Sequence, residues 1–312
     1  MLPVVDLSDA DAAERIGEAC RRFGFFYVLS DIDAGLLEEL DAVARSFFAQ
    51  PTEEKMAIAM AKGGRAWRGY FPLHGELTSG VPDEKEGLYF GAEREADGRR
   101  LVGPNLFASN TMRDVVLAYL DAMTELGHRL TAKLAASLSL PRDYFRARYT
   151  DDPLILFRIF HYPPLPRPDA WSVGAHADYG LLTILLQDDV GGLEVKGPDG
   201  WMPAPPIPGT FVVNLGDMLD RLTGGLYRST LHRVRNPSNR SRLSFPFFFD
   251  PSLDAVIEPL PGTAVLDDEH TRWDQQSVRA FEGTYGDYLV RKIGRVFPDL
   301  DEAVRAASTT AE

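Results

Sequence analysis

The sequence is very poor in cysteine, since Cys20 is the single cysteine among 312 residues. One thiol excludes an intramolecular disulfide framework and a zinc site built from several cysteines. The chain starts Met-Leu-Pro-Val-Val-Asp, without the basic and then apolar segments of a secretory signal, and it has no apolar run of bilayer length. We therefore expect a cytoplasmic protein with no membrane partner.

Positive charge is also scarce, because 33 Lys and Arg residues stand against 46 Asp and Glu residues and give a net charge of -13. Affinity for nucleic acid depends on clustered Lys and Arg, so we expect no nucleic-acid partner. Apolar residues make up 45% and charged residues 25%, as in ordinary globular proteins. These values indicate no particular oligomeric state.

The patterning of apolar residues changes at about residue 150. Helical spacing predicts helices at 12–22, 36–48, 111–140 and 278–293. Between the last two helices, short runs of β-branched and aromatic residues predict strands at 154–162, 176–186, 193–195, 210–215, 232–234 and 242–249. Many short strands at this spacing indicate a sandwich or jelly roll.

His176 and Asp178 form the first candidate for chemistry. Residues two apart in a strand lie on the same face, so this imidazole and this carboxylate can bind one ion. His232, in a later predicted strand, can supply a third ligand. Two imidazoles and one carboxylate leave other positions of the ion open, as Fe(II) oxygenases require. A His-x-Asp pair alone is a weak signal, and the alternative is a structural role.

Arg242 and Ser244 form a second candidate, on one face of the predicted strand 242–249. A core-facing arginine is costly unless it meets an anion, and its planar fork suits a carboxylate. These residues can hold the distal carboxylate of a dicarboxylic acid whose other end binds the metal. The alternative is an exposed edge-strand arginine that pairs with Asp250.

The predicted strand 154–162 has two unlike faces. One face carries Leu154, Leu156, Arg158, Phe160 and Tyr162, and the other carries Ile155, Phe157, Ile159 and His161. The first face suits a polar cavity with aromatic walls, whereas the second suits the core. The alternative is that Arg158 lies on a surface face.

Several longer motifs occur along the whole chain, in this order: Pro3-Val-Val-Asp-Leu7, Gly24-Phe-Phe-Tyr27, Thr52-Glu-Glu-Lys55, His161-Tyr-Pro-Pro164, Gly174-Ala-His-Ala-Asp178, Val213-Asn-Leu-Gly-Asp217, Ser229-Thr-Leu-His-Arg-Val234 and Arg242-Leu-Ser244. With these motifs the chain resembles, nearly end to end, the 2-oxoglutarate/Fe(II) oxygenases of the isopenicillin N synthase type.

The resemblance implies a mainly β fold with helices, a distorted double-stranded β-helix (jelly roll) with an N-terminal α/β region and supporting helices. We expect four parts: an N-terminal α/β region at 1–100, a long supporting helix at 101–149, a jelly-roll catalytic core at 150–255, and a C-terminal helix and tail at 256–312.

The resemblance also implies the residues of the site. The expected ligands of Fe(II) are His176, Asp178 and His232. The expected binding residues for the 2-oxoglutarate carboxylate are Arg242, Ser244 and Tyr162. Asn214 belongs to the same signature and is expected to support the cofactor site.

The implied activity couples oxidative decarboxylation of 2-oxoglutarate, to succinate and CO2, with oxidation of a small molecule by O2. Hydroxylation is the expected outcome, and desaturation or ring closure needs only a different geometry. Arg158 favours a substrate with a carboxylate, such as an amino acid derivative, whereas aromatic walls favour an apolar intermediate of secondary metabolism. The candidate substrate contacts are Arg158, Phe160, Arg68, Tyr70, His74 and Phe247.

Two alternatives remain open at this point. Isopenicillin N synthase carries the same Arg-x-Ser pair, and ACC oxidase is a relative, yet both oxidise without 2-oxoglutarate. Tyr162 beside the Arg-x-Ser pair favours 2-oxoglutarate, and release of succinate would distinguish the two reactions. The other alternative is a metal-binding jelly-roll module without turnover, which would bind iron and 2-oxoglutarate and consume no O2.

Overall fold

The computed structural model describes residues 1–76, 82–165, 171–236, 238–260, 263 and 277–296. Eight strands form a large sheet: β1 (Val4–Val5), β2 (Phe25–Leu29), β3 (Gly69–Phe71), β4 (Glu86–Gly91), β5 (Leu154–Tyr162), β7 (Leu182–Gln187), β10 (Thr210–Leu215) and β12 (Arg242–Asp250). Four strands form a small sheet: β6 (Val173–His176), β8 (Leu193–Gly197), β9 (Gly200–Pro203) and β11 (His232–Val234).

The strand order is β1-β2-β10-β7-β12-β5-β4-β3 in the large sheet and β6-β11-β8-β9 in the small one. Apart from β1 and β2, which are parallel, neighbouring strands of these two sheets run antiparallel. The chain passes repeatedly from one sheet to the other, so the two sheets form a distorted double-stranded β-helix. The predicted jelly roll is therefore confirmed.

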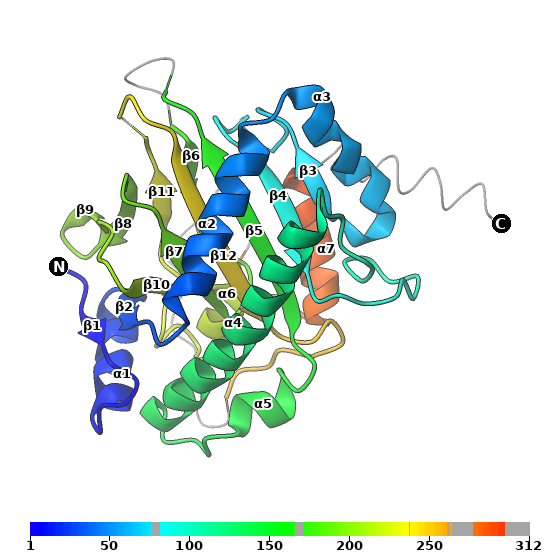
Figure 1. Cartoon of the computed structure of the whole chain (residues 1–312). Coiled ribbons are helices and arrows are strands. Elements are labelled where there is room, and N and C mark those ends of the chain that lie inside the picture. The colour runs from blue at the N-terminus through cyan, green and yellow to red at the C-terminus, as the bar shows by residue number, and fades with distance from the viewer. Residues whose placement is uncertain (77–81, 166–170, 237, 261–262, 264–276, 297–312) are drawn as a thin grey trace.

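Helices cover one face of the large sheet, and Figure 1 shows α2 and α4 crossing in front of its strands. The helices are α1 (Ala12–Arg22), α2 (Ala34–Phe48), α3 (Thr52–Lys55), α4 (Asn110–Ser137), α5 (Tyr144–Arg148), α6 (Asp217–Leu222) and α7 (Tyr285–Val296). Within the described ranges, none of them combines the length and the apolar character that a bilayer-spanning helix needs.

The long helix α4 begins at a side-chain cap and packs closely on β12. The Ser109 hydroxyl accepts a hydrogen bond from the Met112 amide at 3.1 Å, which satisfies a free N–H of the first turn. A Cβ on Gly127 would lie 2.4 Å from the Phe249 ring. Glycine at this position therefore lets the helix lie directly on the sheet.

The strand β12 separates the core from a cavity between the sheets. Its even-numbered residues line the cavity: Arg242, Ser244, Pro246, Phe248 and Asp250. The alternate residues Phe245, Phe247 and Phe249 are almost completely buried on the helix side. The alternation of a strand thus places polar binding groups and core phenylalanines on opposite faces of one element.

Two predicted elements differ most from the structure in their bounds. The run 176–186, predicted as one strand, is interrupted between β6 and β7, where a Cβ on Gly180 would lie 1.4 Å from Asp250 Oδ1. The helix predicted from residue 278 begins at Tyr285, because Gly283 has a φ of 124° that a helix does not allow. The predicted tail lies outside the described residues.

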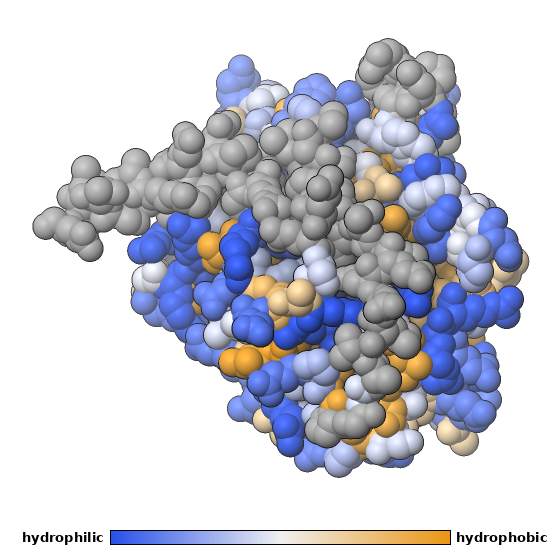
Figure 2. Space-filling model, turned by 180° about the vertical axis from the view of Figure 1, so that it is seen from behind, coloured by the Kyte–Doolittle hydropathy of each residue, from blue (hydrophilic) through white to orange (hydrophobic). Residues whose placement is uncertain are grey.

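The face opposite to that of Figure 1 is shown in Figure 2. Hydrophilic residues cover most of the surface that is not drawn in grey, and apolar residues form small separate groups. This distribution agrees with the acidic composition of the chain.

Candidate active site

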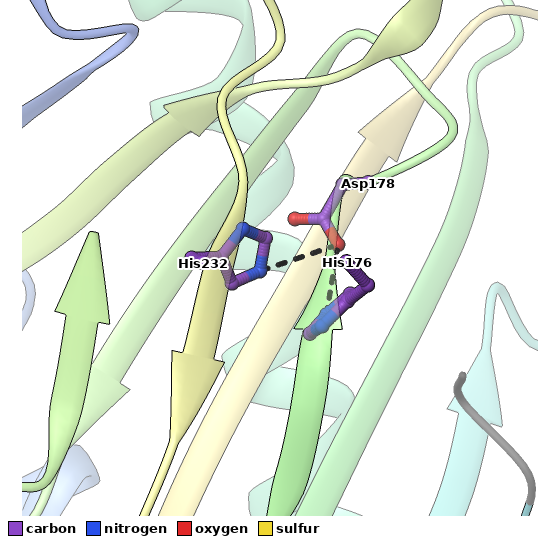
Figure 3. Close-up of side chains that lie close together, drawn as sticks. All are labelled: His176, Asp178 and His232. Carbon is purple, nitrogen blue, oxygen red and sulfur yellow. Dashed lines mark ion pairs between the residues drawn. The ribbon is translucent and has the colours of Figure 1, made fainter. Parts of the chain in front are cut away.

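His176, Asp178 and His232 converge at the edge of the small sheet, as Figure 3 shows. His176 ends β6 and His232 begins β11, and their Cα atoms are direct partners in the antiparallel pairing of these strands. Asp178 lies just beyond β6, in the connection to β7. Its Oδ1 is 3.8 Å from His176 Nε2 and 3.7 Å from His232 Nε2. One potential ligand atom from each residue lies within 4.8 Å of the other two.

Both imidazoles are oriented by the backbone of their own segments. His176 Nδ1 donates to the Gly174 carbonyl at 2.9 Å, and His232 Nδ1 donates to the Thr230 carbonyl at 3.2 Å. Because a carbonyl can only accept, each Nδ1 carries a proton, which leaves Nε2 as the nitrogen that can bind a metal. Burial, and then the neighbouring His232, lowers the pKa of His176 to about 3. A neutral imidazole is the form that binds a metal.

The Asp178 carboxylate is held through its second oxygen. Oδ2 accepts hydrogen bonds from Thr183 Oγ1 at 2.5 Å and from Asn214 Nδ2 at 2.7 Å. Burial would raise the pKa of Asp178, but His232, His176 and the two hydrogen bonds hold it below its usual value. The carboxylate is therefore charged, and its Oδ1 faces the two imidazoles.

The triad opens into a cavity of about 1040 Å³, which includes its open mouth. The cavity extends along β12 from Arg242 to Asp250, and Leu289 of α7 also lines it. We call the part at Arg242 the anchor end and the part at Arg158 the mixed-charge end.

The anchor end contains a buried arginine with free donors. Arg242 is 1% exposed, and its Nη2 donates to Gln187 Oε1 at 3.3 Å. Its Nε and Nη1 have no hydrogen-bond partner within the described part of the chain. Ser244 Oγ lies 3.4 Å from Tyr162 Oη, and the Tyr162 ring lies 4.9 Å from the guanidinium carbon. This arrangement of donors fits a carboxylate.

The mixed-charge end contains four charged groups that compensate one another. Lys85 Nζ lies 3.0 Å from Glu76 Oε2 and 2.7 Å from Asp83 Oδ2. Arg158 Nη1 lies 3.4 Å from Glu76 Oε1, which also accepts from Tyr89 Oη at 2.5 Å. Burial would raise the pKa of Glu76, but Lys85 and Arg158 hold it below its ordinary value. Two acids and two bases thus lie together beside the cavity.

The C-terminal helix α7 is fixed to the cavity wall by two tyrosines. Tyr285 Oη donates to Asp250 Oδ2 at 2.5 Å, and Tyr288 Oη donates to Asp217 Oδ2 at 2.6 Å. The Leu181 amide donates to Asp250 Oδ1 at 3.1 Å. Burial raises the pKa of Asp250 to about 7. The last helix therefore completes the wall at the far end of β12.

The structure brings together most of the predicted site residues. The cavity is lined by the three expected iron ligands, by Arg242, Ser244, Tyr162 and Asn214, and by Arg158 and Phe160. The predicted division of strand 154–162 is also observed. His161, on its second face, contacts Glu86 Oε1 at 2.8 Å rather than the cavity.

Four predicted substrate contacts do not line this cavity in the structure. Phe247 is on the core face of β12, because it is an odd number of residues from Arg242 and Ser244. Tyr70 is buried on the helix side, where its hydroxyl donates to Glu86 Oε2 at 2.5 Å.

Arg68 and His74 are the other two predicted substrate contacts that do not line the cavity. Arg68 is 2% exposed and donates from Nη2 to the Leu101 carbonyl at 2.8 Å, so its guanidinium lies behind the cavity wall. His74 is exposed and its Nε2 lies 3.0 Å from Glu84 Oε2. The segment around these residues does approach the cavity, but through Glu76 instead.

Glu76, Lys85, Asp250 and Phe248 line the cavity and were not predicted as site residues. The alternation that places Arg242 and Ser244 on one face of the strand also predicts that Phe248 lies on that face. The sequence offers Asp250 only as a surface partner of Arg242. Glu76 and Lys85 come from irregular segments, where no periodicity indicates the direction of a side chain.

A jelly roll that presents two histidines and one carboxylate on one side of an open cavity defines a mononuclear non-haem Fe(II) oxygenase. The 2OG-Fe(II) oxygenase superfamily model matches residues 144–251, and the model of the N-terminal region of the non-haem dioxygenase in morphine synthesis matches residues 2–110. The chain belongs to the 2OG-Fe(II) oxygenase superfamily, and it is a 2-oxoglutarate-dependent dioxygenase.

Similar proteins occur among both curated sequences and solved structures. A Dictyostelium discoideum protein named a probable iron/ascorbate oxidoreductase is 46% identical, covering 94% of this chain and 90% of its own. The 1-aminocyclopropane-1-carboxylate oxidase of the same organism is 38% identical, covering 96% of this chain and 95% of its own. The crystal structure of a full-length Neurospora crassa protein in complex with alpha-KG superposes with a TM-score of 0.78 at 27% identity, covering 94% of this chain and 96% of that protein.

Proposed function

We propose that this dioxygenase oxidises an amino acid or a similar small molecule that carries both charges. In this proposal His176, Asp178 and His232 hold Fe(II), and Arg242, Ser244 and Tyr162 hold the distal carboxylate of 2-oxoglutarate. The observation that carries the assignment is the buried Arg242 guanidinium, which has two donors without a partner among the described residues and lies in the same cavity as the triad.

The triad fits a divalent metal in its donor set. Two imidazole Nε2 atoms and one carboxylate oxygen suit Fe(II), and they would leave positions of the ion open for other ligands. Bound Fe(II), 2-oxoglutarate and O2 supply the oxidising power, and 2-oxoglutarate is converted to succinate and CO2. Thr183 and Asn214 keep the carboxylate of Asp178 aimed at the ion.

The anchor end fits the co-substrate for electrostatic reasons. A buried guanidinium without a counter-charge is costly, and a carboxylate on its free Nε and Nη1 removes that cost through charge-assisted hydrogen bonds. The Tyr162 hydroxyl and Ser244 can add neutral hydrogen bonds. Arg242 thereby orients 2-oxoglutarate along β12, with its other end toward the triad.

The mixed-charge end supports the substrate class. Arg158 and Lys85 can attract a carboxylate, while Glu76 and Asp250 can attract an ammonium or guanidinium group. Because Glu76, Asp83, Lys85 and Arg158 sum to no net charge, this end favours a zwitterion over a simple anion. Curated relatives support the same class, since the homoarginine-6-hydroxylase 2-ODD-C23.2 of Arabidopsis thaliana is 34% identical, with 97% of this chain covered.

The test is an anaerobic titration of the Fe(II)-loaded full chain with 2-oxoglutarate, followed by admission of O2. We expect a visible charge-transfer band that His176→Ala abolishes, and succinate release that a free amino acid such as homoarginine or 1-aminocyclopropane-1-carboxylate accelerates. Absence of the band would refute the co-substrate assignment. A band without acceleration by any amino acid would refute the substrate class alone.

We also propose the cytoplasm as the compartment and a small molecule, rather than nucleic acid, as the partner. The single, buried Cys20 gives the fold no dependence on an oxidising environment. The net charge of -13 opposes binding to a phosphate backbone.

A further inference from the structure

A second, much smaller cavity lies behind the wall of the substrate cavity. It is lined by Trp67, Arg68, Tyr89, Phe90, Leu101, Leu156 and Arg158. Leu156 and Arg158 line both cavities, so the Arg158 side chain forms part of the wall between them. The small cavity has room for about one water-sized occupant. It is therefore too small for a substrate.

Three residues of this cavity each carry a buried N–H group without a partner within the described residues. These groups are Trp67 Nε1, Arg68 Nε and Arg158 Nε. Trp67 and Arg68 are each 2% exposed, so bulk water does not satisfy them. Buried donors are rarely left unpaired in native proteins, and three around one cavity indicate a common ligand.

The chemistry of the lining distinguishes between possible ligands. The indole and guanidinium groups only donate hydrogen bonds. The Tyr89 hydroxyl already donates to Glu76 and accepts from Arg158 Nη1, and the Leu101 carbonyl accepts from Arg68 Nη2. A water would need acceptors for its own two protons, of which the second lone pair of the Leu101 carbonyl can supply one, whereas an anion needs none. The cavity is therefore better matched to an anion.

The charges around the cavity support the same conclusion. Burial, and then the positive charge of Arg158, lowers the pKa of Arg68 to about 9, while Glu93 acts in the opposite direction. Glu93 Oε2 is already engaged by Asn105, from which it accepts two hydrogen bonds. An anion between the two guanidinium groups would relieve their repulsion.

The backbone around the cavity is unusual at two positions, and a third position lacks room for a side chain. Trp67 has a φ of 51° and Leu101 a φ of 67°, both in the left-handed region that bulky residues rarely adopt. A Cβ on Gly91 would lie 2.0 Å from Arg68 Nη2, so only glycine lets this guanidinium lie against β4. Strained residues that gather at one place are typical of a binding site.

We propose that this cavity binds a single monatomic anion, chloride under ordinary conditions, between Trp67, Arg68 and Arg158. The ion accepts from the three N–H groups and fixes the Arg158 Nε. The opposite edge of the same guanidinium stays directed at Glu76 and the substrate cavity. Chloride thus acts as a structural ligand that positions Arg158, and it takes no part in the oxidation.

The first experiment is diffraction from crystals of the full chain soaked in bromide, an anomalous scatterer that replaces chloride. We expect an anomalous peak within hydrogen-bond distance of Trp67 Nε1, Arg68 Nε and Arg158 Nε. Density without an anomalous peak would identify a water and overturn the proposal. The result does not depend on iron, on 2-oxoglutarate or on the proposed substrate.

The second experiment measures thermal unfolding of the full chain in sodium chloride and in sodium gluconate at equal ionic strength. We expect chloride to raise the Tm along a saturating curve, by roughly 5 °C at a hundred times its Kd. Trp67→Phe should abolish this dependence, whereas Trp201→Phe, in the small sheet, should retain it. Equal Tm values in both salts, or equal chloride dependence in both variants, would contradict the proposal. If Trp67→Phe does not fold, the bromide experiment still decides.

Discussion

The two ends of the active-site cavity solve the problem of buried charge in opposite ways. At the anchor end, Arg242 is almost fully buried with two free donors and one hydrogen bond to Gln187. At the mixed-charge end, Lys85 and Arg158 are both within ion-pair distance of Glu76. Among the described residues the anchor end has no counter-charge for Arg242, whereas the charged groups of the mixed-charge end balance one another.

The difference shows how a structure without ligands can indicate their charge. An uncompensated buried cation is unfavourable in the free protein, so its presence indicates that an anion binds there. A compensated cluster contributes to folding even without a ligand, and it can exchange internal pairs for pairs with a zwitterion. Arg242 should therefore contribute to ligand binding at some cost to the stability of the fold. Glu76 should contribute both to ligand binding and to stability.

The largest expected effect is on stability, from Glu76→Gln. Removing this carboxylate leaves Arg158 and Lys85 with fewer counter-charges in a buried place, which typically costs about 3–5 kcal/mol. Urea denaturation should show this loss in the free energy of unfolding. Glu84→Gln, which removes a more exposed carboxylate nearby, is the control and should change it little. A loss below about 1 kcal/mol would mean that the cluster does not stabilise the fold.

The second effect is on co-substrate binding, from Arg242→Gln. Losing a buried charge-assisted pair with the co-substrate costs about 2–4 kcal/mol, so the KM for 2-oxoglutarate should rise about 30-fold or more. Without 2-oxoglutarate, the unfolding free energy should stay the same or increase. Arg240→Gln, at an exposed arginine that pairs with Asp189, is the matched control. If Arg242→Gln lowers the unfolding free energy and leaves the KM for 2-oxoglutarate unchanged, Arg242 stabilises the fold and does not bind the co-substrate.

The third expected effect, which is lost near neutral pH, concerns the carboxyl of Asp250. Burial raises its pKa to about 7, so the folded protein holds a proton that the unfolded chain releases above about pH 4. This contribution to stability is complete below about pH 4 and is lost as pH rises to about 7, at no more than about 1.4 kcal/mol per pH unit. Asp250→Asn should remove it. Parallel pH profiles of unfolding for the wild type and the variant would contradict this assignment.

The sequence predicted the parts of the site that lie on regular strands. The period of two in β5 and β12 predicts that Arg158, Tyr162, Arg242 and Ser244 lie on cavity faces, where the structure has them. The same period, continued along β12, predicts Phe248 and not Phe247 as a residue of the cavity wall. That error came from choosing residues by type and not by face.

The direction of side chains in the loops could not be predicted from the period of a strand. Glu76 and Lys85 reach the cavity from irregular segments, and their direction depends on tertiary contacts with Arg158, Asp83 and Tyr89. Asp178 also lies in a connection and not in a strand, so it reaches His176 for a reason other than the one used to predict it. Motifs and their order along the chain carried the resemblance to the family, but only packing shows which charges meet.

The imidazoles of His176 and His232 take their orientation from carbonyl groups two residues earlier in the chain. No side-chain substitution elsewhere removes these two hydrogen bonds, because their acceptors belong to the backbone. The orientation of these two imidazoles therefore does not depend on the side chains of Glu76, Lys85 or Arg158. Over evolutionary time, the specificity of the cavity can diverge while the redox centre is inherited unchanged, which is one physical reason why a single scaffold can acquire many substrates.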